Sequence, residues 1–376
     1  MIALRKMAIQ YRPTIAEIDL NALRHNVAVV RSLIPDQSQI VGIIKADAYG
    51  HGAVMVARTL NSCGIKKMAV ATVEEGSTLR EQGLRSEIMV LGGLFGLNSS
   101  LFREYSLNPV LHNNEDFKAV IAQLKDRDQN LKVHIKFDTG MGRLGFNKSE
   151  LPEMIKKVRY SNGLQVESVM THLANADGCN PQQSEQQIRD LDEIFSAFRE
   201  AGVKVEKHFA NSAAISDGFV SVPQWVRPGI MLYGSYPADR FKNKIDLKPV
   251  MRFKTRLLDV KSMPQGQGIS YGHTFVTKRD SLIGVLPVGY ADGYSRHLTN
   301  KGFVFLKGMK VPVVGRVCMD LTLIDVTDVV DVKIGDEVEL WGENISVDEV
   351  AMQAQTISYE LLCGVSKRVP RVYLNL

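Results

Sequence analysis

Hydrophobic residues follow two alternating patterns over roughly the first 234 positions of the chain. Short runs rich in β-branched residues, typical of strands buried on both faces, are separated by longer stretches in which apolar residues recur every three or four positions, as in amphipathic helices. Asp19 stands where the N-cap of one such helix is expected, and Gly202 stands where another should end. The eight expected strands are IVGIIK (40–45), MAVATV (68–73), EIMVLG (87–92), NPVLH (108–112), KVHIKF (132–137), VESVMTH (166–172), EKHFAN (206–211) and RPGIMLYG (227–234).

Eight strands joined through helices predict a (β/α)8 TIM barrel, which we place at residues 14–240. After about residue 240 the helical period disappears, and strand-like runs follow one another between Gly and Asp turns, with one short helix near VDEVAMQA (347–354). Residues 241–376 are therefore expected to form a mostly β domain. The predicted fold class is α/β, with an N-terminal barrel followed by a mostly-β C-terminal domain.

Charge and cysteine content exclude several classes of protein. The chain has 46 Lys and Arg against 41 Asp and Glu without a run of like charges, so no nucleic-acid partner is indicated. Cysteines 63, 179, 318 and 363 show no CxxC or Cys/His spacing, which argues against a disulfide framework and a metal site. No apolar run reaches the roughly 18 residues of a membrane span, and MIALRKMAIQYRPT (1–14) lacks signal-peptide features. We expect a cytoplasmic protein without a membrane partner.

Polar residues fall at the carboxyl ends of the expected strands, where a barrel builds its active site. Lys45 ends the first strand and His172 the sixth, Asn211 and Ser212 follow the seventh, and Arg143 lies in the glycine-punctuated loop after the fifth. A lysine desolvated at the barrel mouth has a lowered pKa and becomes a nucleophile. A lone lysine is nevertheless more often a solvent-exposed residue, so its position alone does not assign a role.

A series of short motifs resembles the bacterial alanine racemases, enzymes of fold type III that depend on pyridoxal 5′-phosphate. KADAYGHG (45–52) is similar to the cofactor-attachment motif of that family, and the further motifs follow in the family's order along nearly the whole chain. The family's barrel followed by a β domain, in a dimer, agrees with the pattern above. The further motifs are DTGMGRLGF (138–146), MTHLANAD (170–177), ANSAA (210–214), VRPGIMLYG (226–234), SYGHTF (270–275), VGYADGYSR (288–296), VGRVCMD (314–320), and SYE with KRVPR (358–371).

The resemblance implies two bases, one on each face of the reacting carbon. Lys45 matches the lysine that carries the cofactor and acts on one face, and Tyr271 matches the base on the other. An ordinary tyrosine has a pKa near 10, so it needs help to act near neutral pH. The resemblance implies that His172 is the hydrogen-bond partner of Tyr271, and that Arg227 lies on the far side of His172. Without its motif, Tyr271 would be interpreted as an aromatic residue packed at a strand end.

Arg227 matches the residue that contacts the pyridine nitrogen of the cofactor. A guanidinium only donates hydrogen bonds and stays charged, so this nitrogen must accept and remain unprotonated. The ring then withdraws electrons less strongly, which favours return of the proton over side reactions. Considered without the family, Arg227 followed by Pro228 could equally be an ion-pair residue at a strand end.

The remaining site residues are also implied by resemblance. Bulky Tyr271 and Tyr359 would limit the substrate side chain to about a methyl group, which indicates alanine. Lys136 lies where some members carry a carbamylated lysine that orients Arg143. The residues that match cofactor contacts are Tyr49, Asn211, Ser212, Gly229, Ile230 and Tyr359. Those that match substrate contacts are Arg143 and Met319, and those that match the channel through which substrate enters are Tyr290, Arg296 and Asp320.

Three other functions were weighed. A pyridoxal-phosphate-dependent amino-acid decarboxylase of the same architecture would pair the pyridine nitrogen with an acid, whereas this chain has Arg227. A broad-specificity amino-acid racemase usually carries an export signal. A non-enzymatic pyridoxal-phosphate carrier is typically a single barrel, so the β domain and Tyr271 count against it. We therefore expect a homodimeric alanine racemase with shared active sites that supplies D-alanine for peptidoglycan, although a catabolic role stays open.

Overall fold

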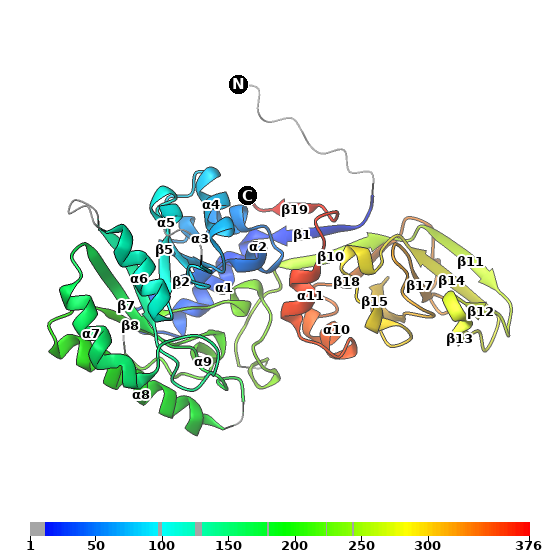
Figure 1. Cartoon of the computed structure of the whole chain (residues 1–376). Coiled ribbons are helices and arrows are strands. Elements are labelled where there is room, and N and C mark those ends of the chain that lie inside the picture. The colour runs from blue at the N-terminus through cyan, green and yellow to red at the C-terminus, as the bar shows by residue number, and fades with distance from the viewer. Residues whose placement is uncertain (1–11, 97–99, 125–129, 179, 223, 243) are drawn as a thin grey trace.

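The computed structural model describes every residue except 1–11, 97–99, 125–129, 179, 223 and 243. Most of the segment MIALRKMAIQYRPT (1–14), on which the expectation of a cytoplasmic protein partly rests, therefore lies outside the described residues. The chain builds a helix-rich barrel at one end and a β-rich region at the other (Figure 1). No helix among the described residues is long and apolar enough to cross a membrane.

Eight parallel strands form the barrel, as the sequence pattern predicted. Their order is β8-β7-β6-β5-β4-β3-β2-β9. The two outermost strands in this order, β8 and β9, are linked just beyond their carboxyl ends, where the Arg227 N–H donates to the Ala210 carbonyl (2.8 Å). The strands are nearly continuously buried, as expected where helices cover the outside and side chains fill the inside. They are β2 (Gln39–Ile43), β3 (Lys67–Val70), β4 (Glu87–Val90), β5 (Asn108–Leu111), β6 (Leu131–Lys136), β7 (Leu164–Met170), β8 (Glu206–His208) and β9 (Trp225–Val226).

Helices alternate with these strands. Asp19 caps the first helix as predicted, because its carboxylate accepts hydrogen bonds from the N–H groups of Asn21 (2.8 Å) and Ala22 (3.3 Å). The helices of this region are α1 (Leu20–Ser32), α2 (Lys45–Tyr49), α3 (Ala53–Ser62), α4 (Val73–Glu81), α5 (Ser100–Glu104), α6 (Asn114–Gln123), α7 (Leu151–Tyr160), α8 (Pro181–Glu200) and α9 (Ser212–Ser216).

Two strand assignments were wrong. The segment 227–234 is not a strand: the eighth strand is β9, directly before it, and Ile230–Tyr233 forms a 3₁₀ helix. Pro228 has no N–H to contribute to a ladder, so the strand ends before it. Lys45 likewise does not end a strand, because β2 stops at Ile43 and Lys45 begins α2.

The C-terminal region is mostly β, as predicted. A six-stranded sheet has the order β16-β15-β18-β10-β1-β19, and β11, β14 and β17 form a second sheet beside the short pair β12–β13. The strands are β1 (Ile15–Asp19), β10 (Met251–Arg256), β11 (Asp259–Met263), β12 (Gly268–Ile269), β13 (Phe275–Val276), β14 (Ser281–Leu286), β15 (Phe303–Leu306), β16 (Met309–Pro312), β17 (Thr322–Asp325), β18 (Glu337–Trp341) and β19 (Arg371–Leu374). The helices are α10 (Val347–Gln353), close to the expected one, and α11 (Ser358–Gly364).

The first strand of the chain belongs to this second region. β1 pairs antiparallel with β10 and parallel with β19, so it lies inside the six-stranded sheet and not in the barrel. The proposed limits 14–240 and 241–376 place β1 with the barrel, and as a division into domains they stay a prediction. Local pattern could not reveal the partners of β1, since both lie more than 230 positions further along the chain.

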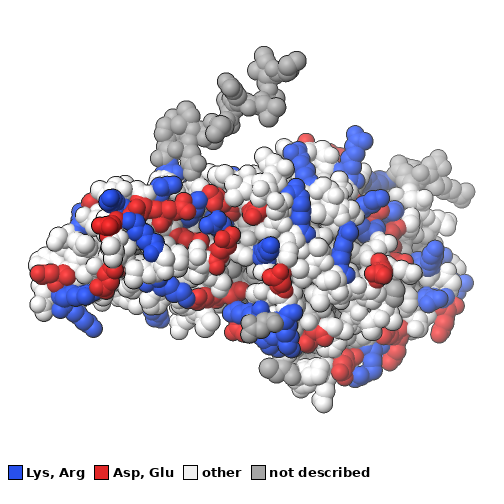
Figure 2. Space-filling model, turned by 180° about the vertical axis from the view of Figure 1, so that it is seen from behind, with Lys and Arg blue, Asp and Glu red and all other residues white. Residues whose placement is uncertain are grey.

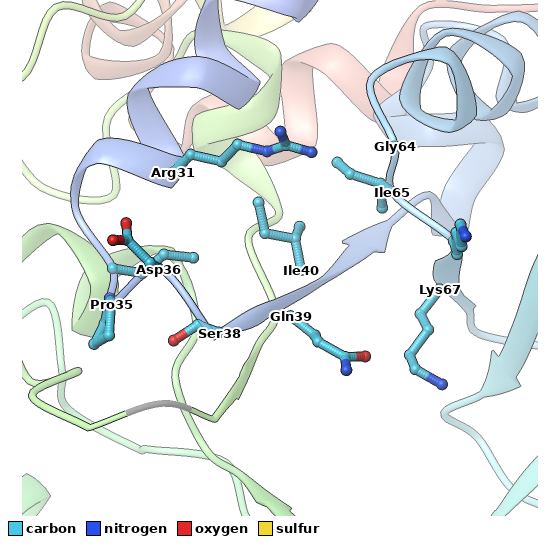
Figure 3. A pocket seen from close by; sticks show the side chains of 11 residues that line it. Arg31, Pro35, Asp36, Ser38, Gln39, Ile40, Gly64, Ile65 and Lys67 are labelled. Atoms are coloured by element: carbon cyan, nitrogen blue, oxygen red, sulfur yellow. The ribbon is translucent and has the colours of Figure 1, made fainter.

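A cavity of about 570 Å³ opens at the amino ends of β2 and β3, on the side of the barrel opposite the strand carboxyl ends (Figure 3). Arg31, Asp36, Gln39 and Lys67 are among the residues that line it. None of the candidate site residues does. Seen from behind, the molecular surface carries basic and acidic side chains close together (Figure 2), in keeping with the nearly balanced charge of the sequence.

Candidate active site

A second cavity, of about 610 Å³, lies at the carboxyl ends of the barrel strands. This is the end of the barrel at which TIM-barrel enzymes place their chemistry. Most of the residues proposed from the sequence line this one space. They are Lys45, Tyr49, Lys136, Arg143, His172, Asn211, Ser212, Arg227, Gly229, Ile230 and Tyr359.

Lys45 enters the cavity from the start of a left-handed turn. Residues 46–49 all have φ between 51° and 56°, a conformation that costs a residue with a side chain roughly 1–2 kcal/mol. Two carboxylates hold the turn: Glu75 accepts from the Ala46 N–H (2.7 Å), and Asp47 accepts from the Ala53 N–H (2.7 Å). The left-handed turn at residues 46–49, and not the end of a strand, therefore sets the direction in which the Lys45 side chain points.

The surroundings of Lys45 favour its neutral amine. Burial, and next the charge of Arg143, lower the pKa of Lys45 below the ordinary value of lysine. A larger neutral fraction makes a better nucleophile and a usable proton acceptor near neutral pH. Lys45 thus meets the chemical requirement that the sequence analysis placed on it.

Four of the five N–H donors of Arg227 are committed to the protein. Nη1 donates to His208 Nδ1 (2.6 Å) and to the His208 carbonyl (3.0 Å), and Nη2 donates to the carbonyls of Thr171 (2.7 Å) and Phe209 (3.2 Å), with a longer, shared contact to His172 Nδ1 (3.5 Å). Only the Nε–H has no partner among the described residues. Burial lowers the pKa of Arg227 to about 9, so the guanidinium stays charged at neutral pH. One fixed donor remains for an acceptor in the cavity.

His172 is a neutral imidazole with a defined tautomer. Burial, followed by the charges of Arg227 and Arg143, lowers the pKa of His172 to about 3. Arg227 Nη2 lies 3.5 Å from His172 Nδ1, and because a guanidinium can only donate, Nδ1 accepts. The single imidazole proton is then on Nε2, which is available as a donor.

One wall of the cavity is suited to an anion. Ser212 Oγ accepts the N–H of Gly229 (2.9 Å), and the centroid of the Tyr49 ring lies 4.8 Å from that of Tyr233 and 5.9 Å from that of Tyr359. Burial raises the pKa of both Tyr49 and Tyr359, so their hydroxyls stay protonated donors. Protonated hydroxyls grouped at one wall in this way are suited to bind a phosphate group.

Arg143 and Lys136 line the same cavity. The loop that carries Arg143 is folded around Asp138, whose carboxylate accepts the N–H groups of residues 140–143 at 2.8–3.1 Å. Burial, and next the charges of Arg143 and Arg227, lower the pKa of Lys136 to about 8. Lys136 therefore carries an appreciable neutral fraction at physiological pH.

The candidate residues after position 270, except Tyr359, do not reach the Lys45 cavity of their own chain. Tyr271, Met319 and Asp320 line a separate pocket of about 520 Å³ in the β-rich region. Tyr271 is 71% exposed and Met319 53% exposed, unusually high values for residues expected to contact substrate. Tyr290 is also exposed, and Arg296 lines another small pocket with Arg316.

Sequence reasoning missed several residues at the site. Asp177 and Cys363 line the Lys45 cavity. His208 and Thr171 accept hydrogen bonds from the guanidinium of Arg227 and so fix its position. A signal for His208 and Thr171 exists in the sequence, since each is a polar residue within an expected barrel strand. Their contact with Arg227 depends on neighbouring strands and has no local signature.

Comparison with known proteins assigns the chain to a family. The sequence models described as "Alanine racemase, N-terminal domain" and "Alanine racemase, C-terminal domain" match residues 18–237 and 250–373. The chain belongs to the alanine racemase family. It is 44% identical over 369 residues to an alanine racemase of Halothermothrix orenii, covering 97% of both chains. It is 39% identical over 378 residues to alanine racemase 2 of Caldanaerobacter subterraneus, covering 97% of this chain and 96% of that protein.

Solved alanine racemases share the fold over nearly the whole chain. The enzyme of Clostridium difficile superposes with a TM-score of 0.90 at 36% identity and 96% coverage of each chain. That of Streptomyces lavendulae superposes with a TM-score of 0.92 at 30% identity, covering 97% of this chain and 98% of that one. Alanine racemases are isomerases that depend on pyridoxal phosphate.

The cavity fits this cofactor. Arg227 presents one unpaired Nε–H, which suits the acceptor nitrogen of a pyridine ring, and the protonated hydroxyls of Tyr49 and Tyr359 suit a phosphate. Gly229 leaves room beside Tyr49, because a Cβ there would lie 2.6 Å from the tyrosine hydroxyl. Lys45 supplies an amine of lowered pKa in the same cavity.

The variant Gly229→Ala tests the phosphate wall. The added Cβ must displace the Tyr49 hydroxyl, which lies 2.6 Å from the position it would occupy. Overpacking of this kind costs roughly 1–3 kcal/mol, so affinity for pyridoxal phosphate should fall about tenfold in a spectroscopic titration. Gly364→Ala is the matched control, since a Cβ at Gly364 meets nothing within 4 Å. Equal affinity of the two variants would contradict the assignment of this wall.

Proposed function

We propose that this protein interconverts L-alanine and D-alanine, with pyridoxal phosphate held covalently by Lys45 and with Lys45 and Tyr271 as the two bases. The observation that carries the proposal is the joint presence, in one cavity, of a lysine of lowered pKa and an arginine with a single unpaired donor. Both residues stand in motifs that resemble those of alanine racemases, which supports the proposal.

Bound pyridoxal phosphate weakens the Cα–H bond of an amino acid by drawing its electrons into the ring. Arg227 would moderate this effect, because its Nε–H would donate to the ring nitrogen and leave it unprotonated. Tyr49, Ser212, Gly229, Ile230 and Tyr359 would hold the phosphate, and Asn211 caps α9, the helix that begins at Ser212, by accepting the Ala214 N–H (3.0 Å). The Lys45 amine, once free, accepts or returns the proton at one face of Cα.

The second face belongs to Tyr271, which we place in the site of the partner subunit. The exposed position of Tyr271 and Met319 suits residues that enter a neighbouring cavity. His172 is proposed to donate its Nε2–H to the Tyr271 oxygen, with Arg227 in contact with the other ring nitrogen of His172. The chain is therefore proposed to act as a homodimer in which each site uses both subunits.

Substrate selection follows from the same residues. Arg143 and the Met319 N–H are proposed to bind the alanine carboxylate through charge-assisted hydrogen bonds. Tyr271 and Tyr359 close the space around the side chain, and Tyr290, Arg296 and Asp320 border the channel to the solvent. We place this reaction in the cytoplasm and assign it to D-alanine supply for peptidoglycan.

Chiral analysis of the product tests the proposed function. Purified enzyme loaded with pyridoxal phosphate should convert L-alanine into a mixture of both enantiomers, and should leave L-serine and L-lysine largely unchanged. Release of CO₂ from any of the three would instead identify a decarboxylase. Racemisation of all three would identify a broad-specificity racemase, and no reaction would favour a carrier.

Tyr271→Phe should separate the two faces. Since Tyr271 is proposed to handle the proton of L-alanine and Lys45 that of D-alanine, the variant should slow solvent-deuterium exchange into L-alanine at least about a hundredfold, and into D-alanine far less. Tyr160→Phe, at a surface tyrosine that is 80% exposed, is the matched control. Equal slowing with both enantiomers would favour a single base.

Lys136 should bind CO₂ as a carbamate. Only the neutral amine adds CO₂, and with a pKa of about 8 half of Lys136 is neutral at that pH, against about 0.3% of an ordinary lysine. A carbamate carbon signal from ¹³C-bicarbonate should therefore grow as pH rises from 7 to 9 and be lost in Lys136→Gln. Lys132→Gln should keep it, because the carboxylates of Glu87 and Glu167 outweigh burial and raise the pKa of Lys132. A signal unaffected by Lys136→Gln would refute the assignment.

A further inference from the structure

A chain of hydrogen bonds runs through the interior of the barrel, behind Arg227. It passes from Arg227 Nη1 to His208 Nδ1 (2.6 Å), from His208 Nε2 to Ser168 Oγ (2.8 Å), and from Ser168 Oγ to His134 Nδ1 (2.7 Å). At most 4% of each of these four side chains is exposed. Barrel interiors are normally filled by apolar side chains, so a polar chain at this position calls for a functional explanation.

The chemistry of the four groups fixes the direction of every bond. Arg227 can only donate, so His208 Nδ1 accepts and the imidazole proton of His208 is on Nε2. That proton is donated to Ser168 Oγ, and the Ser168 hydroxyl then donates to His134 Nδ1. Burial lowers the pKa of His134 to about 3, and that of His208 well below its ordinary value, so both rings are neutral. All three bonds therefore point away from Arg227.

An irregularity in the sheet brings Ser168 to this position. In the pairing of β6 with β7, Val133 lies opposite Val166 but His134 lies opposite Ser168, so Glu167 is skipped. Without this bulge, His134 would face Glu167, and Ser168 would be out of step with the residues that point into the barrel. Bulges commonly re-aim a side chain next to an active site. The bulge here supplies the one hydroxyl that joins His208 to His134.

We propose that Ser168 and His134 are positioning residues for the racemase reaction, which act through His208 to hold the Arg227 guanidinium so that its Nε–H faces the cavity. The inference rests on the proposed role of Arg227 toward pyridoxal phosphate. Neither residue touches the cavity, and neither belongs to any motif that identified the family. Loss of Ser168 leaves the buried His208 Nε2–H without an acceptor, so the ring reorients and Arg227 loses its fixed support.

Ser168→Ala in the loaded full-length enzyme is the primary test. It should change the ¹⁵N shifts of both ring nitrogens of His208, observed in enzyme labelled only at histidine, and lower kcat about tenfold with KM for alanine within about twofold. Ser168→Thr keeps the hydroxyl and should restore both. Ser184→Ala is the matched control and should change neither, because Ser184 is fully buried and its hydroxyl has no hydrogen-bond partner among the residues that the structure describes.

The outcomes separate positioning from simple support of the fold. If Ser168→Ala keeps the His208 shifts and kcat of the unmodified enzyme, the proposal is wrong even when the melting temperature falls. Should Ser168→Ala not yield soluble protein, His134→Phe decides by the same criteria, since it removes the acceptor but keeps an aromatic ring against Trp225. The nitrogen shifts report on His208 whether or not the enzyme racemises alanine. Failure of this inference is thus distinguishable from failure of the proposed function.

Discussion

Replacement of Lys45 with alanine should abolish racemisation, with a fall in kcat/KM of at least about a thousandfold. The variant loses both the amine that attaches pyridoxal phosphate and the base on one face of Cα. In the unmodified enzyme, borohydride should fix the cofactor to a single peptide containing Lys45, and this labelling should vanish in the variant. Mass spectrometry of the reduced, digested protein measures it.

Lys45→Arg provides the control for charge. It keeps a cation at the mouth of the barrel but cannot form the covalent link, so it should be as inactive as the alanine variant. Labelling at Lys136, the other cavity lysine of lowered pKa, would show that the wrong amine had been assigned. Activity retained by either Lys45 variant would remove the basis of the proposed mechanism.

Mixing two inactive variants should restore about a quarter of the normal activity. In a mixed dimer of one Lys45→Ala chain and one Tyr271→Phe chain, one shared site contains both substitutions and the other shared site contains neither. Random reassociation of equal amounts makes about half of the dimers mixed, each with one intact site of two. The reason to expect sharing is structural, since Tyr271 and Met319 are exposed and line a pocket separate from the Lys45 cavity.

Recovery must follow the formation of mixed dimers, which differently tagged chains make measurable. Mixing Lys45→Ala with Lys45→Arg is the matched control and should restore nothing, because every site then lacks Lys45. If purified mixed dimers of Lys45→Ala and Tyr271→Phe stay inactive, each site is built within one chain and the placement of Tyr271 fails.

The sequence pattern was sufficient for the barrel and for the grouping of residues at its mouth. Parallel strands buried on both faces leave continuous apolar runs, and the carboxyl ends of such strands must meet at one end of a barrel. Lys45, His172 and Arg143 could therefore be placed together from the sequence pattern, and they do line one cavity. Their roles in catalysis stay predictions.

Features that depend on distant pairing or on strain could not be predicted. The left-handed turn at residues 46–49 contradicts the local preference of alanine and aspartate, and is held by Glu75 from another element. The chain of hydrogen bonds from Arg227 to His134 requires a bulge, which shifts the register of β7 without altering its apolar pattern. Both features lie next to the site, where structures most often depart from local rules.

The position of β1 makes the two ends of the protein depend on each other. Residues 15–19 are made first, yet their neighbours in the sheet, β10 and β19, are the first and last strands after the barrel. During synthesis one edge of this strand can pair only after residues 251–256 have been made, and the other edge only after residues 371–374 have been made. A gene cut at residue 240 would give one half with an unpaired strand and another half with a gap between β10 and β19. Engineered fragments and fusions should therefore keep the chain whole, and misfolding is expected to begin at this delayed closure.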